Sequence, residues 1–506
     1  MLKTPVIGKN GVVAAEHPTA SLVGLNVLKS GGNAFDATIA TSFALSVLQP
    51  HLGGLGSDFF ALFYSAKKDK IYCLNSSGWA PKELTIDKLT EHGYKSMPKN
   101  GPHSVTIPGL VYGLSELHKN YGTFEWSELI KDSIDLASNG FPVYWGLSRA
   151  INALSSELAK DRGFKKYFLP NGEPPKVGQI LKHKDLANTL NLISNDPTAF
   201  YKGEIAKKIV EYLNELDGVH QINDFAEFKP EWCNPISIDY RGTTVYEIPP
   251  NSMGATSLLL LNLLEELGTW KFGFSSKGRI LRTIEAAKIA YAERDNTLAD
   301  PQFAKIDIKK FISKEFAKQL LKQARIGLEK YLSGGDTTYF AVADKEGNIV
   351  SAIQSLFYPF GSGLVVDGLG VPLNARGSYF KFDGPNKLEP RKRSLHTLSA
   401  LLLEKEGKVF AALGASGGDF RPQQHALFVT NMIDYKMTLW DALEAPRFLW
   451  DGKKVIVEDG LEVPPYEEYQ KIEYLGKTGV AQGIVKKENV LISYCDTRGD
   501  GLPAGF

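Results

Sequence analysis

The chain has 506 residues, 43% of them hydrophobic, which can bury a large core in two to four domains or in one interleaved α/β domain. Charge is nearly balanced, with 58 Lys and Arg residues against 57 Asp and Glu residues, which argues against a nucleic-acid surface and an acidic tail. The three cysteines, Cys73, Cys233 and Cys495, are far apart and lack metal-ligand spacing, so we expect no disulfide framework and no metal site.

The N-terminal residues 1–5 lead into a polar patch at 8–11 without an apolar core segment, so we expect no secretory signal there. The longest apolar stretch, residues 34–48, is interrupted by Asp36, Thr38 and Ser42. It is too short and too polar to span a membrane. We therefore expect a cytoplasmic protein with no membrane partner.

Helical and strand-like patterns are mixed along the chain, which predicts a fold with both helices and sheets. The helical patterns cover residues 19–30, 34–48, most of 110–216, 257–267, 279–294, 313–332 and 419–433. The strand-like patterns cover residues 58–64, 71–75, 243–248, 339–343, 349–357, 397–403 and 408–413. Asp419 is the expected N-cap of the helix at 419–433.

The stretch Gly334-Gly335-Asp336-Thr337-Thr338 places Thr337 where a flexible loop enters a strand. On local pattern alone Thr337 is an ordinary strand residue, since threonine favours strands. If the Asp336–Thr337 bond is cut, however, Thr337 gains an α-amine with a reference pKa of about 8 beside its own hydroxyl. That amine can act as the general base for the hydroxyl, which makes Thr337 a candidate N-terminal nucleophile.

Ser416 is a second candidate nucleophile, because Gly414 to Gly418 matches Gly-x-Ser-x-Gly between a predicted strand and a predicted helix. A serine hydrolase of that type needs an acid and then a histidine downstream. The only histidine after Ser416 is His425, which falls in the same predicted helix. Alternatively, the N–H groups of Gly417 and Gly418 at a helix N-terminus can stabilise an oxyanion. A third interpretation is that the segment is an ordinary glycine-rich turn without a catalytic role.

Many motifs, in one order over nearly the whole chain, resemble those of the γ-glutamyltranspeptidase family of N-terminal nucleophile (Ntn) hydrolases. In the first part they are GVVAAEHP at 11–18, LKSGGNAFDA at 28–37, QPHLGGLG at 49–56, VTIPG at 105–109 and PPNSMG at 249–254. In the second part they are DTTYFAVADKEGN at 336–348, FGSG at 360–363, RSLHTLS at 393–399 and GASGG at 414–418. The resemblance implies an α+β architecture, a four-layer αββα sandwich made from one precursor.

The resemblance also implies self-cleavage at the Asp336–Thr337 junction, into a large segment of residues 1–336 and a small segment of residues 337–506. The two segments would stay associated as one αββα domain, with a dimer of such heterodimers left open. Thr337 would attack a small amide and pass its acyl group to water or to an acceptor amine, without a cofactor. Ser355 matches a second hydroxyl that bonds the nucleophile, and Gly417 and Gly418 match the oxyanion glycines.

Five positions that the resemblance assigns to substrate binding depart from the γ-glutamyl pattern. They are Phe357, Arg376 and Tyr379, in place of an asparagine, a glutamine and an aspartate that hold the α-amino group, and His396 and Thr397, in place of a serine pair that binds the carboxylate. Ser77 also stands where the family has a carboxylate-binding arginine. Losing an aspartate while gaining an arginine reverses the charge preference of the subsite, because a buried ammonium without a partner costs several kcal/mol.

We therefore expect a glutathione hydrolase-like threonine amidohydrolase or acyltransferase, whose donor has a carboxylate or neutral acyl end and no free α-amine. Glutaryl-like or oxamate-like amides fit better than γ-glutamyl compounds. Arg376 would be the anchor, with Tyr379 and His396 as hydrogen-bonding groups, and a structural ion pair is the alternative role of Arg376. Two other functions stay open, an unprocessed and inactive binding protein and a serine hydrolase that uses Ser416.

Overall fold

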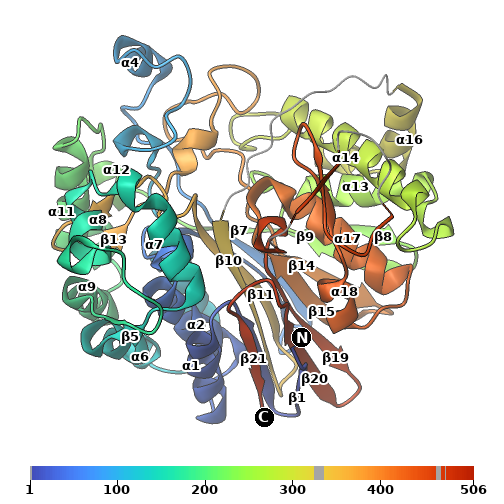
Figure 1. Ribbon diagram of the computed structural model, residues 1–506, viewed down its shortest axis with the longest axis horizontal. Helices are drawn as coiled ribbons and strands as arrows, with labels where there is room; N and C mark the ends of the chain where they lie inside the picture. Colours follow the sequence, from blue (N-terminus) through green and yellow to red (C-terminus); the bar gives the residue numbers. More distant parts are fainter. Residues whose placement is uncertain (1–2, 324–335, 463–468, 473–474) are drawn as a thin grey trace.

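The computed structural model describes residues 3–323, 336–462, 469–472 and 475–506, and two seven-stranded sheets form its centre (Figure 1). One sheet has the strand order β21 (Leu502–Gly505), β2 (Gly11–Ala15), β10 (Asp336–Asp344), β11 (Ile349–Phe357), β3 (Asp58–Ser65), β4 (Lys70–Ser76) and β7 (Glu231–Cys233). The predicted hairpin that begins near Thr337 is confirmed, because β10 and β11 pair antiparallel at the middle of this sheet.

The second sheet has the strand order β1 (Val6–Gly8), β20 (Val490–Cys495), β19 (Ala481–Lys487), β15 (Lys408–Ala415), β14 (Leu401–Lys405), β9 (Thr243–Glu247) and β8 (Ile236–Tyr240). The hairpin predicted at 397–413 is present as β14 and β15. Its first strand begins at Leu401 rather than at Thr397.

Side chains alternate along the strands, so each sheet buries both of its faces. On β10, Tyr339, Ala341 and Ala343 lie in a core that also contains Leu402 and Ala412 of the other sheet. The intervening residues of β10 belong instead to the core that the first sheet shares with its covering helices. The sheets therefore stack on one another and each has a helical layer outside, which confirms the predicted αββα fold (Figure 1).

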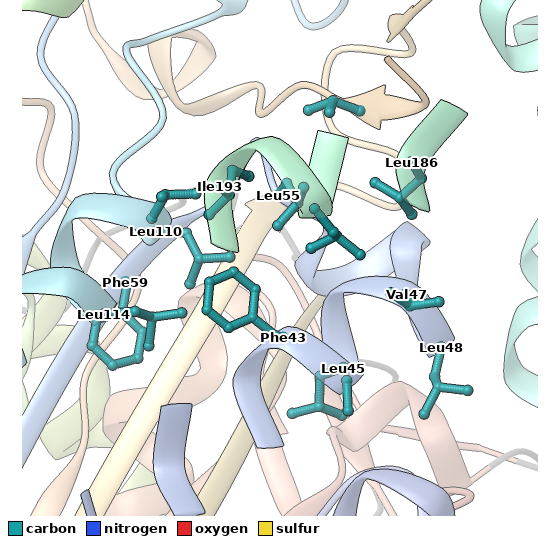
Figure 2. Close-up of a cluster of buried hydrophobic side chains, with 14 of the residues drawn as sticks. Phe43, Leu45, Val47, Leu48, Leu55, Phe59, Leu110, Leu114, Leu186 and Ile193 are labelled. Atoms are coloured by element: carbon teal, nitrogen blue, oxygen red, sulfur yellow. The ribbon is translucent and has the colours of Figure 1, made fainter. Parts of the chain in front are cut away.

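The helices of the first sheet lie on the left of Figure 1 and those of the second sheet on the right. The first group includes α1 (Pro18–Lys29), α2 (Ala34–Leu48), α5 (Leu110–Tyr121), α6 (Trp126–Asn139), α7 (Trp145–Leu158) and α9 (Lys184–Asn195). The second group includes α13 (Gly254–Glu266), α14 (Lys277–Thr297), α16 (Lys314–Gln323), α17 (Arg421–Ile433) and α18 (Leu439–Glu444). Figure 2 shows Phe43 of α2 close to Phe59 of β3 and Leu110 of α5, which anchors α2 against the first sheet.

The prediction that Asp419 caps a helix is wrong. Residues Gly418–Phe420 form a 3-10 turn, and α17 begins at Arg421 with a proline in its first turn. The carboxylate of Asp419 instead accepts hydrogen bonds from Arg294 Nη1 at 2.8 Å and from the hydroxyl of Tyr379. Of the helix predicted at 313–332, α16 covers Lys314–Gln323, and residues 324–335 lie outside the described residues.

The cysteine pair Cys73 and Cys233, far apart in the sequence, stands directly opposite across β4 and β7. All three cysteines are free thiols.

Over the residues that the structure describes, no three side chains of His, Cys, Asp or Glu are grouped so as to hold a metal ion. Within the same ranges, no helix combines the length and apolar character that crossing a bilayer requires.

Candidate active site

Thr337 lies at the start of β10, opposite an irregularity in β11. Asp336 pairs with Phe357 and Thr338 pairs with Gln354, so two residues of β11 stand opposite Thr337 in a β-bulge. Bulges re-aim side chains next to active sites. Thr337 is 1% exposed, and its hydroxyl donates a hydrogen bond to Ser355 Oγ at 3.2 Å. The structure thus brings the two predicted hydroxyls together.

A buried polar network holds the strands beneath Thr337. The hydroxyl of Thr338 donates to Gln49 Oε1 at 3.1 Å, and Gln354 Nε2 donates to the carbonyl of Gly53 at 2.6 Å. A Cβ at Gly53 would lie 2.7 Å from the methyl group of Thr338, so no side chain fits there. The QPHLGGLG motif therefore packs its backbone against the entry of β10, which explains why that stretch is rich in glycine.

Gly417 and Gly418 form the turn between β15 and α17. Their φ angles are 135° and 56°, in the left-handed region that glycine adopts without strain. Gln424 Nε2 braces this turn by donating to the carbonyls of Ser416 at 2.9 Å and Thr478 at 2.6 Å. In the described part of the chain neither glycine N–H donates a hydrogen bond to another backbone group, so both can receive a developing negative charge.

Ser416 is not assembled with a histidine. Its hydroxyl accepts a hydrogen bond from the backbone N–H of Val480 at 2.9 Å. His425, inside α17, makes its contact through Nδ1 to Glu247 Oε1 at 2.6 Å. A serine nucleophile needs its hydroxyl next to the base, and this arrangement does not provide one.

The five predicted substrate-binding residues form one cluster around Arg376, with Tyr379 half-buried and the other four fully buried. Its Nη1 donates to Thr397 Oγ1 at 2.9 Å, and its guanidinium lies 4.4 Å from the ring centre of Phe357. Its Nε lies 3.5 Å from Asp58 Oδ2, so a carboxylate that the sequence did not point to balances its charge. Burial lowers the pKa of Arg376 to about 10, and the side chain stays protonated at neutral pH. Its Nη2 has no hydrogen-bond partner among the described residues.

His396 shares the carboxylate of Asp58 with Arg376. Its Nε2 lies 2.9 Å from Asp58 Oδ2, while its Nδ1 accepts the backbone N–H of Leu398 at 3.1 Å. Burial, together with the charge of Arg376, lowers the pKa of His396 to about 3. The imidazole is therefore neutral, with its proton on Nε2 pointing to Asp58.

Tyr379 connects this cluster to the glycine turn. Its hydroxyl donates to Asp419, the residue after Gly418, and burial raises its pKa. Its ring stands edge-on to Phe357 with 5.4 Å between the ring centres. Ser77, at the position of the family's arginine, is buried and donates to Asn75 Oδ1 at 2.7 Å. Position 77 therefore contributes no guanidinium, whereas Arg421, whose Nη1 donates to the carbonyl of Thr397, is a second buried guanidinium beside Arg376.

A cavity of about 620 Å³ lies beside Thr337, and sequence reasoning did not find its lining. Its polar side chains include Glu16, Gln49, His51, Arg149 and Asp500, together with Ser416. None of the five predicted substrate-binding residues lines it. Glu16, Gln49 and His51 fall in the GVVAAEHP and QPHLGGLG motifs, so the sequence could have indicated these three as site residues. Arg149 and Asp500 belong to no motif, so the sequence could not have indicated them.

Comparison with known proteins agrees with the fold and the motifs. The family model described as Gamma-glutamyltranspeptidase matches residues 20–506. The chain is 36% identical, over 99% of both chains, to the glutathione hydrolase-like YwrD proenzyme of Bacillus subtilis (strain 168). It is 32% identical to the glutathione hydrolase proenzyme of Escherichia coli (strain K12), over 99% of this chain and 93% of the relative.

Among solved structures, the cephalosporin acylase from Bacillus halodurans superposes with a TM-score of 0.91 and 35% identity. The match covers 100% of this chain and 97% of the acylase. Both the predicted family and the predicted enzyme class are confirmed. This chain belongs to the γ-glutamyltranspeptidase family of Ntn hydrolases, together with glutathione hydrolases and acylases.

Proposed function

We propose that this protein cuts its own chain before Thr337 and then uses the Thr337 hydroxyl to hydrolyse small amides or transfer their acyl groups. The observation that carries the proposal is the contact between Thr337 and Ser355 at the bulge where β10 begins. Ser416, the residue before Gly417, lines the same cavity as Thr337, which supports an oxyanion role for the N–H groups of Gly417 and Gly418.

Self-cleavage would begin when the Thr337 hydroxyl attacks the carbonyl carbon of Asp336. The peptide nitrogen leaves that carbon and takes up the proton, which gives an ester and a free α-amine on Thr337. Water then hydrolyses the ester to a carboxylate on Asp336 and restores the hydroxyl. Residues 1–336 and 337–506 would stay together, because β10 and β11 lie between β2 and β3 in one sheet.

In the acyl-transfer step, the α-amine of Thr337 takes the hydroxyl proton while the oxygen attacks the amide carbon. The N–H groups of Gly417 and Gly418 stabilise the oxyanion. The proton passes to the leaving amine as the carbon–nitrogen bond breaks, which leaves an acyl-threonine ester. Water or a second amine then attacks the ester and regenerates Thr337.

The acyl end of the donor would bind at Arg376. Asp58 already balances the charge of this guanidinium. Nη2 of Arg376 therefore attracts a ligand mainly as a hydrogen-bond donor, and not as an unpaired positive charge. A carboxylate or carbonyl oxygen can accept that hydrogen bond. An α-ammonium would meet the guanidinium groups of Arg376 and Arg421 and the neutral imidazole of His396. The two nearby carboxylates are already engaged, Asp58 by Arg376 and His396 and Asp419 by Arg294 and Tyr379. Glutaryl-like and oxamate-like amides therefore fit the cluster better than γ-glutamyl amides.

A panel of anilides that share one leaving amine tests this specificity. We expect kcat/KM for glutaryl anilide to exceed that for γ-glutamyl anilide by about 10-fold or more, since a poorly paired buried ammonium costs at least about 1.4 kcal/mol. The release of aniline is measured on processed protein, with Thr337→Ala as the blank. Equal kcat/KM values for the two anilides would show that Arg376 does not select the acyl end.

Replacing Gly417 by alanine tests the oxyanion role. A Cβ there would lie 2.5 Å from Gln424 Nε2, which two carbonyls hold in place, so the turn must move. We expect kcat per processed chain to fall by about 10² to 10³, the cost of losing one oxyanion donor. Gly407→Ala is the matched control, because Gly407 also has a positive φ of 74° but no atom within 4 Å of the added Cβ. Equal losses in the two variants would contradict the assignment.

A further inference from the structure

Part of the lining of the cavity beside Thr337 is apolar. Leu52, Ala150, Ala153, Leu154, Pro359 and Val480 line it. Trp145, the first residue of α7, lines it as well and is 71% exposed. A large aromatic side chain that is both exposed and part of a cavity wall offers a flat contact surface for a ligand ring.

The charges on the cavity wall cancel. Glu16 and Asp500 contribute carboxylates, and Arg149 and Arg498 contribute guanidinium groups. Arg498 is bound within the protein, with its Nη2 2.5 Å from Glu458 Oε2. Asp500 Oδ2 accepts the backbone N–H of Gly146 at 2.8 Å, next to Trp145. The lining therefore has no formal net charge from these four side chains, which leaves the apolar residues and Trp145 as its distinguishing feature.

His51 is a polar residue of this lining, and one of its ring nitrogens is both inaccessible and unpartnered within the described part of the chain. The side chain is 4% exposed and lines the cavity together with Thr337. Its Nδ1 has no hydrogen-bond partner among the described residues. Burial, with smaller contributions from the charges of Arg149 and His17, lowers its pKa to about 3, so the imidazole is neutral. A buried polar nitrogen without a partner is costly, and a ligand that hydrogen-bonds it removes that cost.

We propose that this cavity is the subsite for the amine part of the amide, and that the amine carries an aromatic or apolar group. Trp145 contacts the ring of the amine, and His51 forms a hydrogen bond near its nitrogen. The assignment rests on the proposed function, in which Thr337 attacks the amide bond. Because the cluster around Arg376 takes the acyl end and contributes no side chain to this cavity, the other half of the amide occupies the cavity.

Direct binding of an amine tests the subsite without any turnover. Benzylamine and methylamine are titrated by calorimetry into the wild-type protein, Trp145→Ala and Trp270→Ala. We expect benzylamine to bind wild type at least about 10-fold more tightly than methylamine, and Trp145→Ala to remove that advantage, since aromatic contact adds about 0.5–1.5 kcal/mol beyond area burial. Trp270, exposed at 38% and absent from the cavity lining, is the matched control and should keep the advantage. Equal affinities for the two amines in wild type, or equal losses in the two variants, would overturn the proposal.

Kinetics separate this proposal from the proposed function. Glutaryl benzylamide and glutaramide share an acyl group, but they release benzylamine and ammonia. Trp145→Ala should lower kcat/KM about 10-fold for the benzylamide and leave the value for glutaramide unchanged. Benzylamine binding that depends on Trp145, without turnover of either amide, would contradict only the proposed function. If both amides are turned over and Trp145→Ala lowers kcat/KM equally for the two, that result would contradict only the amine subsite.

A second variant tests the role of His51. His51→Leu removes the unpartnered nitrogen and is expected to weaken both benzylamine and methylamine about 5-fold, the effect of one neutral hydrogen bond. Trp145→Ala should instead affect benzylamine alone. Unchanged affinities for both amines in folded His51→Leu protein would show that this nitrogen does not contact the ligand.

Discussion

Thr337→Ala is expected to yield one unbroken chain with no measurable amide turnover. The substitution removes the hydroxyl that attacks Asp336, so no new N-terminus forms and no α-amine is released. Activity should fall by at least about 10⁴-fold, the scale of losing a covalent nucleophile. Stability should change little, because among the described residues the hydroxyl donates one hydrogen bond, of 3.2 Å, to Ser355. Denaturing gels, intact mass spectrometry and anilide turnover measure these outcomes.

Two further variants make this test specific. Thr338→Ala removes the neighbouring hydroxyl, which donates to Gln49 Oε1, and should still be cleaved. Thr337→Ser keeps a hydroxyl at the start of β10 and should retain both cleavage and part of the turnover. A single full-length band for wild type and Thr337→Ala alike would support an unprocessed binding protein and would refute the mechanism.

Asp58→Ala is expected to lower the free energy of unfolding by about 3–5 kcal/mol, the cost of removing one partner of a buried ion pair. The Asp58 carboxylate, fully buried at the start of β3, serves three donors. It accepts the backbone N–H of Gly78 at 2.7 Å and contacts His396 Nε2 at 2.9 Å and Arg376 Nε at 3.5 Å. Its loss leaves a guanidinium charged inside the protein, so urea denaturation should show a lower midpoint.

A surface ion pair provides the matched control for Asp58. Glu83 lies 2.7 Å from Lys88 Nζ, and both side chains are about 40% exposed, so Glu83→Gln should lower the free energy of unfolding far less than Asp58→Ala does. Asp58→Ala combined with Arg376→Met should recover much of the lost stability, because the unpaired charge is then gone. If Asp58→Ala costs no more than Glu83→Gln, Arg376 does not depend on this carboxylate.

Local sequence was enough to predict the β10–β11 hairpin and the position of Thr337 at its start. A turn signal between two apolar, β-favouring runs specifies a hairpin through short-range interactions alone. The same reasoning failed at Asp419. An acidic residue before a helical pattern is typical of an N-cap, but here Arg294 and Tyr379 bind its carboxylate. Those partners are distant in sequence, so no local pattern could indicate them.

The resemblance to the family predicted that five residues bind the substrate together, and the structure places them in one cluster. They are Phe357, Arg376, Tyr379, His396 and Thr397. It did not indicate that Asp58 balances Arg376, or that His51 and Trp145 line a cavity beside Thr337. Cys73 and Cys233 show the same limit, since residues far apart in the chain stand face to face across β4 and β7.

The amino-acid sequence by itself determined the family, the αββα architecture and the residue that we propose as nucleophile. These depend on ordered motifs and on the periodicity of single segments. Only the tertiary structure decided which charges are balanced and which walls enclose the space beside Thr337. Ion pairs and cavities form between elements that the packing of two sheets brings together, and the free energy of a buried charge depends on those neighbours rather than on its position in the chain.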